Sequence, residues 1–213
     1  MIQTDNIYVN TIEMTNILHA KQVLDVSLCR EISRQILDYK FRTPTSENTS
    51  PNCWRGNPHL SETGLTDEIN GILQDTISRH RAIYDETLIR PHLFGQPTDE
   101  INRYDTAHPK ISAWFNVNGI NGGNPVHTHS GNYLSGTLYF QAEDTGYIEF
   151  MSQNYLYKSM NYCWPYFGSA RYNPSDGDLL MFPSYLAHFV EPNPVLRPRI
   201  NMAFDIRYDF KNI

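Results

Sequence analysis

The second half of the sequence, from Ile111 onward, consists of short apolar runs that alternate with turn-forming segments. In the final run Ile200, Met202, Phe204 and Ile206 alternate with polar or small residues, so one face of this strand is expected to be buried. Several short antiparallel strands at this spacing predict a mainly β fold whose core is a jelly roll, that is, a double-stranded β-helix, or a barrel. The five runs with strand composition are ISAWFNV, YLSGTLYFQ, GYIEFM, DLLMFP and INMAFDIRYDF.

The first half carries two helical patterns instead. The first helix places apolar residues four positions apart on one face, and Asp25 or Ser27 is expected to cap it. The second is expected to run from an N-cap at Thr66 to about Thr87. These patterns predict N-terminal helices beside the β core.

The length of 213 residues fits a single domain. We expect residues 1–110 to form a helical support region that packs outside the barrel, and residues 111–213 to form the jelly-roll core. The helices are also candidates for the contact surface of a homodimer or for a lid over the substrate.

The composition excludes several functional classes. The formal net charge is −6, and no dense run of Lys or Arg marks a nucleic-acid surface. No apolar stretch approaches the roughly 20 residues that span a bilayer, and the N-terminus lacks the pattern of a signal peptide. The scattered cysteines Cys29, Cys53 and Cys163 favour free thiols in a reducing compartment. The sequence therefore predicts a cytoplasmic protein without nucleic-acid or membrane partners.

Three histidines are the candidate metal ligands. His127 and His129 stand two apart in an extended stretch, so both side chains are expected on the same face. His188 follows 61 residues after His127, at the end of the run DLLMFP. A jelly roll brings distant strands together, and three ligands on one side of a metal would leave open positions for substrate.

Arg199 begins the last strand and is expected deep in the barrel. A buried guanidinium needs an anion, and its planar fork suits a carboxylate. In the alternative interpretation Arg199 is an exposed partner of Asp205 or Glu191, and Arg197 is the functional arginine.

The segments PVHTHSGNYLSGTLYFQ and GDLLMFPSYLAHFVEPNPVLRPRINMAFDI carry these residues. Together they resemble the 2-oxoglutarate/Fe(II)-dependent oxygenase family, with its H-x-H…S-G-x-x-Y and F-P-S-x-x-x-H-x-V-x-P-N…R-I signatures, which occurs in bacteria and phages. The order of motifs also resembles prolyl 4-hydroxylases. The resemblance covers about Ile111 to Asp209. It implies a dioxygenase that uses Fe(II), 2-oxoglutarate and O2 to hydroxylate a substrate, with succinate and CO2 as products, in the host cytoplasm if a phage encodes it.

Carried over by position, the resemblance implies His127 and His188 as iron ligands and Arg199 as the partner of the distal carboxylate of 2-oxoglutarate. His129 falls where the wider superfamily has Asp or Glu. His129 could complete a three-histidine site, which is the outcome we favour. It could instead bind 2-oxoglutarate or the substrate, or a carboxylate such as Asp178 could enter as a ligand.

Polar residues on the neighbouring strands are further candidates. Tyr139 and Ser135 are four apart and share a strand face, and together with Asn116 they are expected to bind 2-oxoglutarate. Tyr139 could equally be a core residue. Tyr133 and Trp114 are expected to line the substrate cavity.

Two other functions fit parts of the pattern. GDLLMFPSYLAHFVEPN also resembles the second cupin motif, which would give a three-histidine metalloenzyme without 2-oxoglutarate. The Glu of the first cupin motif is absent, since Tyr133 and Leu134 occupy its positions. A non-catalytic jelly-roll binding module would need no metal at all. The primary substrate is open among a peptide, a protein side chain and a small molecule.

Overall fold

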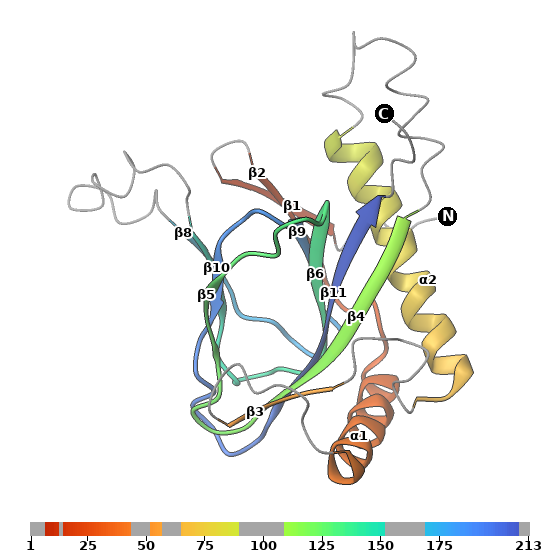
Figure 1. Ribbon diagram of the computed structural model, residues 1–213, viewed down its shortest axis with the longest axis vertical. Helices are drawn as coiled ribbons and strands as arrows, with labels where there is room; N and C mark the ends of the chain where they lie inside the picture. The colour runs from red at the N-terminus through yellow and green to blue at the C-terminus, as the bar shows by residue number, and fades with distance from the viewer. Residues whose placement is uncertain are drawn as a thin grey trace, which may run out of the picture.

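The computed structural model describes residues 7–12, 15–43, 52–56, 65–89, 109–151 and 169–208. These residues form two antiparallel sheets that face one another, with two helices against the outer side of the larger sheet (Figure 1). The larger sheet has the order β1-β2-β9-β6-β11-β4-β3 and the smaller one β5-β10-β7-β8. The predicted mainly β jelly-roll fold is confirmed.

All five runs predicted as strands form strands. They are β4 (Pro109–Asn118), β6 (Leu134–Gln141), β7 (Ile148–Met151), β9 (Leu179–Pro183) and β11 (Arg199–Tyr208). Along β11 the four apolar residues that alternate in the sequence are buried, and they belong to the core cluster that also contains residues of the helices. The residues between them point to the opposite side of the sheet, toward the smaller sheet.

Six strands were not predicted. Three precede residue 110, namely β1 (Ile7–Ile12), β2 (Thr15–Ala20) and β3 (Cys53–Arg55), and all three join the larger sheet. The other three are short strands of the smaller sheet, namely β5 (Asn124–His127), β8 (Ser169–Tyr172) and β10 (His188–Val190). Strands β3, β5, β8 and β10 have only three or four residues each, too few to show a period of two in the sequence. The described residues before β4 therefore extend the sheet as well as supporting it.

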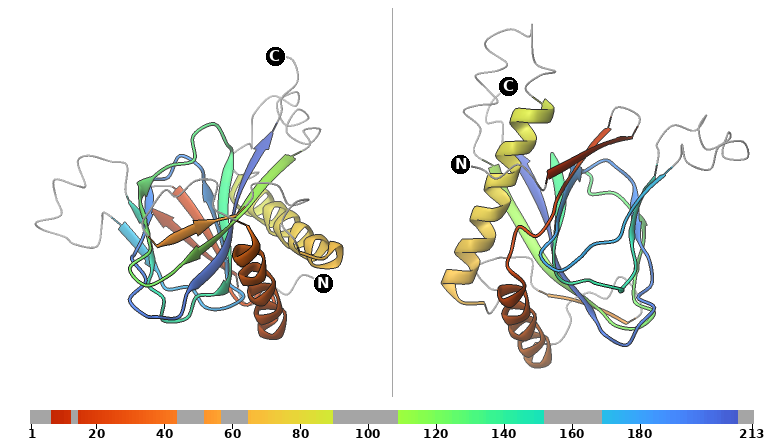
Figure 2. Two further views of the ribbon diagram at one scale, coloured as in Figure 1. Left: turned by 60° about the horizontal axis from the view of Figure 1, so that its bottom comes forward. Right: turned by 180° about the vertical axis from the view of Figure 1, so that it is seen from behind.

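The two predicted helices are α1 (Val26–Arg42) and α2 (Asp67–Tyr84), and α2 continues into a π-helical turn at Asp85–Ile89. The predicted caps are present: Asp25 accepts a hydrogen bond from the Ser27 amide at 2.7 Å, and Thr66 accepts one from the Ile69 amide. Apolar side chains of both helices pack into one core with β4, β6 and β11. Both helices thus hold the outer face of the larger sheet, as two further views show (Figure 2).

A second apolar cluster fills the space near the smaller sheet. Phe150 of β7, Phe182 of β9 and Leu186 belong to it, and each is at most 2% exposed. The Phe150 and Phe182 rings pack against each other with centroids 4.6 Å apart. This cluster closes one side of the space between the sheets.

Two of the three cysteines lie in the described residues. Cys29 is buried in α1, Cys53 is half-buried in β3, and neither forms a disulfide. Cys163 lies outside the described residues. None of the described helices combines the length and the apolar character that crossing a membrane requires.

Candidate metal centre and co-substrate cavity

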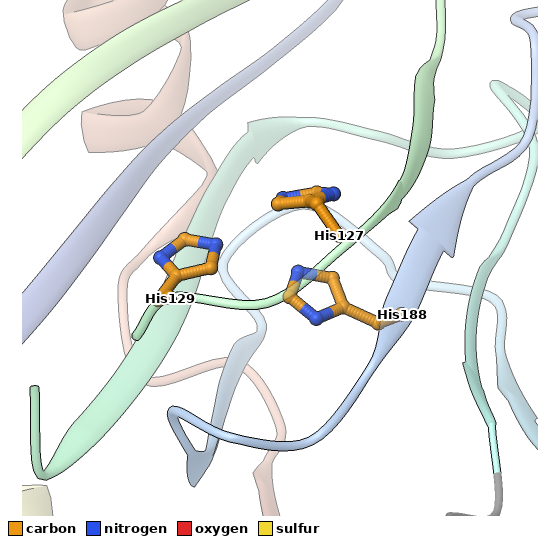
Figure 3. Close-up of side chains that lie close together, drawn as sticks. All are labelled: His127, His129 and His188. Carbon is orange, nitrogen blue, oxygen red and sulfur yellow. The ribbon is translucent and has the colours of Figure 1, made fainter. Parts of the chain in front are cut away.

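The three predicted histidines converge between the sheets (Figure 3). His127 ends β5 and His188 begins β10, and the two residues are direct partners in the ladder between these strands. His129 follows two residues after His127 and reaches the same point. One ring nitrogen of each residue lies within 4.8 Å of the others, a spacing that can hold a metal ion. The predicted meeting of HxH with a distant histidine is therefore present in the geometry.

Each imidazole has its Nδ1 atom engaged by an oxygen. Nδ1 lies 2.8 Å from the Pro125 carbonyl in His127 and 3.0 Å from the Leu186 carbonyl in His188. In His129 it lies 2.7 Å from Oδ1 of Asp205. A carbonyl or carboxylate oxygen requires a proton on Nδ1, which leaves the lone pair on Nε2 for a metal.

The Nε2 atom of His129 is buried and has no hydrogen-bond partner. An unsatisfied buried nitrogen is costly unless it has a ligand. Three imidazoles at this spacing, each with its Nδ1 engaged, fit a first-row divalent ion and leave other positions open. The residues present therefore fit Fe(II), with His129 in the position that completes the set.

The surroundings of His127 and His188 favour the neutral ring that metal ligation requires. Burial, and to a smaller extent the neighbouring His127, lower the pKa of His188 to about 3. Burial also lowers the pKa of His127. The Phe182 ring packs against His188 at 4.8 Å between centroids and contributes to this apolar environment.

Asp205 supplies the carboxylate nearest to the three rings. It lies on β11 opposite Ser135 of β6, and the Ser135 hydroxyl donates to the same Oδ1 atom that faces His129, at 2.6 Å. Ser135 therefore lies behind the metal position as a partner of Asp205. No local pattern singles out Asp205 as the partner of His129, because the pairing depends on strand register.

Asp178, the alternative carboxylate ligand, is engaged elsewhere. Its oxygens accept hydrogen bonds from His19 Nε2 and from the amides of Gln22 and Ser175, each at 3.1 Å. It does not belong to the histidine cluster. This arrangement ties β2 to β9 and gives Asp178 a structural role.

Arg199 lies on the wall of the same cavity and is 1% exposed, so the interpretation as an exposed ion pair is wrong. Its terminal nitrogens donate to the carbonyls of Thr145 and Glu191 at 2.9 and 3.0 Å. Its Nε is buried without a partner, and none of the described carboxylates lies within ion-pair distance of it. Arg197 is exposed and donates to the Glu143 carbonyl. A buried cation of this kind needs an anion from solution.

Polar groups beside Arg199 extend this anion site. Tyr139 and Thr137 of β6 line the cavity, as does Asn201, the β11 residue opposite Tyr139. Asn201 donates to the Thr137 hydroxyl at 2.9 Å, and burial raises the pKa of Tyr139 to about 12, which keeps its hydroxyl a donor. Sequence reasoning missed Thr137 and Asn201. The period of two along β6 from Ser135 to Tyr139 was the signal that could have found Thr137.

The cavity that joins the histidines to Arg199 has a volume of about 440 Å³. Asn116 and Trp114 line it, as predicted for the co-substrate and substrate regions. Tyr133 lies instead against the helical side, where it donates to Asp85 and packs on Tyr208. One partly enclosed space thus contains a metal-binding end and an anion-binding end.

Comparison with known proteins identifies the class. Residues 112–205 match the family described as "Putative 2OG-Fe(II) oxygenase". The match covers 94 of the 213 residues, and over this segment the chain is similar to the 2-oxoglutarate/Fe(II) oxygenases. No curated protein matches the sequence. The family recognised from the sequence motifs is confirmed.

Solved structures confirm the fold. A prolyl 4-hydroxylase from Pseudomonas putida matches with 14% identity and a TM-score of 0.61, over 91% of this chain and 92% of the other. HygX from Streptomyces hygroscopicus, solved with nickel and 2-oxoglutarate bound, matches with 10% identity and a TM-score of 0.56, over 92% and 84%. A prolyl hydroxylase from Trichoplax adhaerens, solved with a peptide fragment of the hypoxia inducible factor, matches with 14% identity and a TM-score of 0.61, over 90% and 83%.

The family match and the histidine cluster support an enzyme of the 2-oxoglutarate/Fe(II)-dependent oxygenase class, with Fe(II) and 2-oxoglutarate as its cofactors. The roles of single residues, the substrate, the homodimer, the cytoplasmic location and the phage origin stay predictions.

Proposed function

We propose that this oxygenase hydroxylates an unactivated C–H bond of a small molecule or of a peptide or protein side chain. One O2 and one 2-oxoglutarate would be consumed for each hydroxyl group formed, with succinate and CO2 released. One oxygen atom enters the substrate and the other enters succinate, so atoms and electrons balance. The observation that carries the proposal is the joint presence of a three-histidine cluster and a buried, carboxylate-free arginine in one cavity.

In this proposal His127, His129 and His188 hold Fe(II) through their Nε2 atoms. The oxygen partners of the Nδ1 atoms keep the protons in place and fix the planes of the rings. Three neutral ligands make the metal more electron-poor than two histidines and a carboxylate would. Asp205 offsets this by placing a negative charge directly behind His129.

Arg199 binds the far carboxylate of 2-oxoglutarate through its unpartnered Nε, assisted by the hydroxyls of Tyr139 and Thr137. The carbonyls of Thr145 and Glu191 hold the guanidinium rigid before the co-substrate arrives. Such preorganisation lowers the entropic cost of binding. When both are bound, iron and 2-oxoglutarate supply the oxidising chemistry, while the protein supplies orientation and a water-poor cavity.

The first test is anaerobic titration of the Fe(II)-loaded chain with 2-oxoglutarate, followed through the visible charge-transfer band of a chelated keto acid. The band is expected in the wild-type protein and is expected to be lost in His127→Ala. His80→Gln is the matched control, since His80 is a buried histidine of α2 that is bonded to the Thr76 carbonyl and is not part of the cluster.

The outcomes separate the alternatives. Iron binding without the band would favour a cupin-type three-histidine enzyme that needs no keto acid. An absence of iron binding would rule out the enzyme and favour a binding module.

A further inference from the structure

Arg55 brings a second guanidinium into the cavity. It is the last residue of β3, where it pairs with Asn116 of β4, and it lines the same space as the histidines. Its guanidinium carbon lies 4.4 Å from the centre of the Trp114 ring. Trp114 in turn stacks on His129, with ring centroids 5.7 Å apart and planes inclined by 22°. Arg55 therefore contacts the Trp114 ring, which in turn contacts the candidate iron ligand His129.

No anionic group of the described protein neutralises Arg55. No described carboxylate lies within 4.0 Å of the guanidinium, and no oxygen of the described residues accepts from its N–H groups. Arg171 of β8 makes the contrast clear. It also covers an aromatic ring, that of Tyr147, at 4.6 Å, yet it bonds Glu149 at 2.5 Å as well. The five donors of Arg55 are thus available to a ligand.

The charges of the cavity leave room for one more anion. Its charged lining residues are Arg55, Arg199 and Asp205. Ferrous iron would add two positive charges and 2-oxoglutarate two negative ones. The two arginines and the iron then outweigh Asp205 and the co-substrate by one positive charge. Unpaired charge in a partly enclosed site is unfavourable, and an anionic ligand would remove the imbalance.

We propose that the primary substrate carries an anionic group, a carboxylate or a phosphate, which binds Arg55 while the carbon to be hydroxylated lies beside the iron. This rests on the proposed function. A planar guanidinium fixed over an indole ring presents its edge for two parallel hydrogen bonds to such a group. The cavity of about 440 Å³ must also hold 2-oxoglutarate, so the part of the substrate that enters is small. Arg55 is then the residue that selects the substrate.

The test uses the full chain, loaded anaerobically with Fe(II) and 2-oxoglutarate, and calorimetric titration with matched probes. Acetylglycine is compared with acetylglycinamide, and glycerol 3-phosphate with glycerol, so that each pair differs in the anionic group. We expect the anionic member of one pair to bind more tightly than its neutral counterpart, and the preferred pair separates a carboxylate from a phosphate. Arg55→Gln is expected to weaken that binding tenfold or more, as loss of a charge-assisted hydrogen bond does.

Two variants secure the interpretation. Arg55→Lys keeps the charge over Trp114 and is expected to recover part of the anion binding. Such a recovery would show that the weaker binding of Arg55→Gln comes from the lost charge and not from a folding defect. Arg171→Gln removes a second ring-stacked arginine, which lies outside the cavity, and is expected to leave anion binding unchanged.

Three results would overturn the assignment. Equal binding of the charged and neutral probes to the wild-type protein would remove the anion preference. Equal anion binding by Arg55→Gln and wild type would remove Arg55 from the substrate site. A loss of the 2-oxoglutarate band in Arg55→Gln would assign Arg55 to the co-substrate instead. Absence of that band in the wild-type protein would contradict the proposed function itself, and with it this inference.

Discussion

Asp205→Asn tests whether the charge behind His129 contributes to metal binding. The Oδ1 atom lies 2.7 Å from Nδ1 of His129, and both side chains are largely buried, 13% and 10% exposed. Across the imidazole and a metal–nitrogen bond of about 2.1 Å, the carboxylate would lie roughly 6–7 Å from the metal. A unit charge and a dication at that distance attract by about 1 kcal/mol in a water-like medium and about 5 kcal/mol at an effective dielectric constant of about 20.

Asparagine keeps an oxygen that accepts from Nδ1–H, so this substitution removes mainly the charge. We expect the affinity for a divalent metal to fall by about 10- to 100-fold, or roughly 1.4 to 2.7 kcal/mol, which is the usual effect of losing a partner of a ligating histidine. The measurement is competitive titration with Zn(II) or Co(II) against a chelating dye. Asp178→Asn is the control, because it removes a buried carboxylate that contacts His19 and not the cluster.

The reasoning would be refuted if Asp205→Asn folded normally and bound the metal within about twofold of the wild-type affinity. That result would mean that Asp205 acts only as a hydrogen-bond acceptor, or that solvent screens its charge. Asp205→Ala would then separate these two explanations, since it removes the acceptor as well.

Three further predictions concern neighbouring groups. His129→Asp should bind Co(II) weakly, because its carboxylate faces that of Asp205, and adding Asp205→Asn should restore affinity; additive effects in the double variant would contradict this. Arg199→Met should weaken 2-oxoglutarate tenfold or more in the charge-transfer titration while the affinity for iron stays within a few fold. Burial alone would raise the pKa of Asp178, but the hydrogen bonds from His19 and two amides outweigh it and the pKa is lowered. The stability gained is therefore present above about pH 4 and lost as the pH falls through the lowered pKa, so denaturant titrations of Asp178→Asn and wild type should converge in acid.

The sequence was most informative where a pattern repeats along one strand or helix. Both helices with their caps and the five strands β4, β6, β7, β9 and β11 were predicted, because alternation and capping are local properties. Strands β5 and β10 were missed although they carry His127 and His188. Their burial depends on the opposite sheet rather than on their own composition.

In the candidate site, too, the residues marked by a local motif could be predicted, and those placed by the pairing of distant strands could not. His127, His129 and His188 could be grouped from spacing and motif alone, and the structure brings them together. Asp205 and Arg55 could not be found, since each reaches the cavity through a strand pairing, with Ser135 of β6 and with Asn116 of β4. Register between distant strands is set by the whole sheet and leaves no mark in a short stretch of sequence.

His129 stands where the wider superfamily has a carboxylate, and this difference connects the charges of Asp205 and Arg55. A neutral third ligand leaves the site more positive, and Asp205 returns one negative charge behind the ring instead of on the metal. Arg55 acts in the opposite direction, because its contact with Trp114 holds a positive charge near the same histidine. The negative charge of Asp205 thus lies behind the His129 ring, while the guanidinium of Arg55 lines the cavity. A site charged in this way favours an anion beside Arg55, and it does so most strongly once the metal is bound.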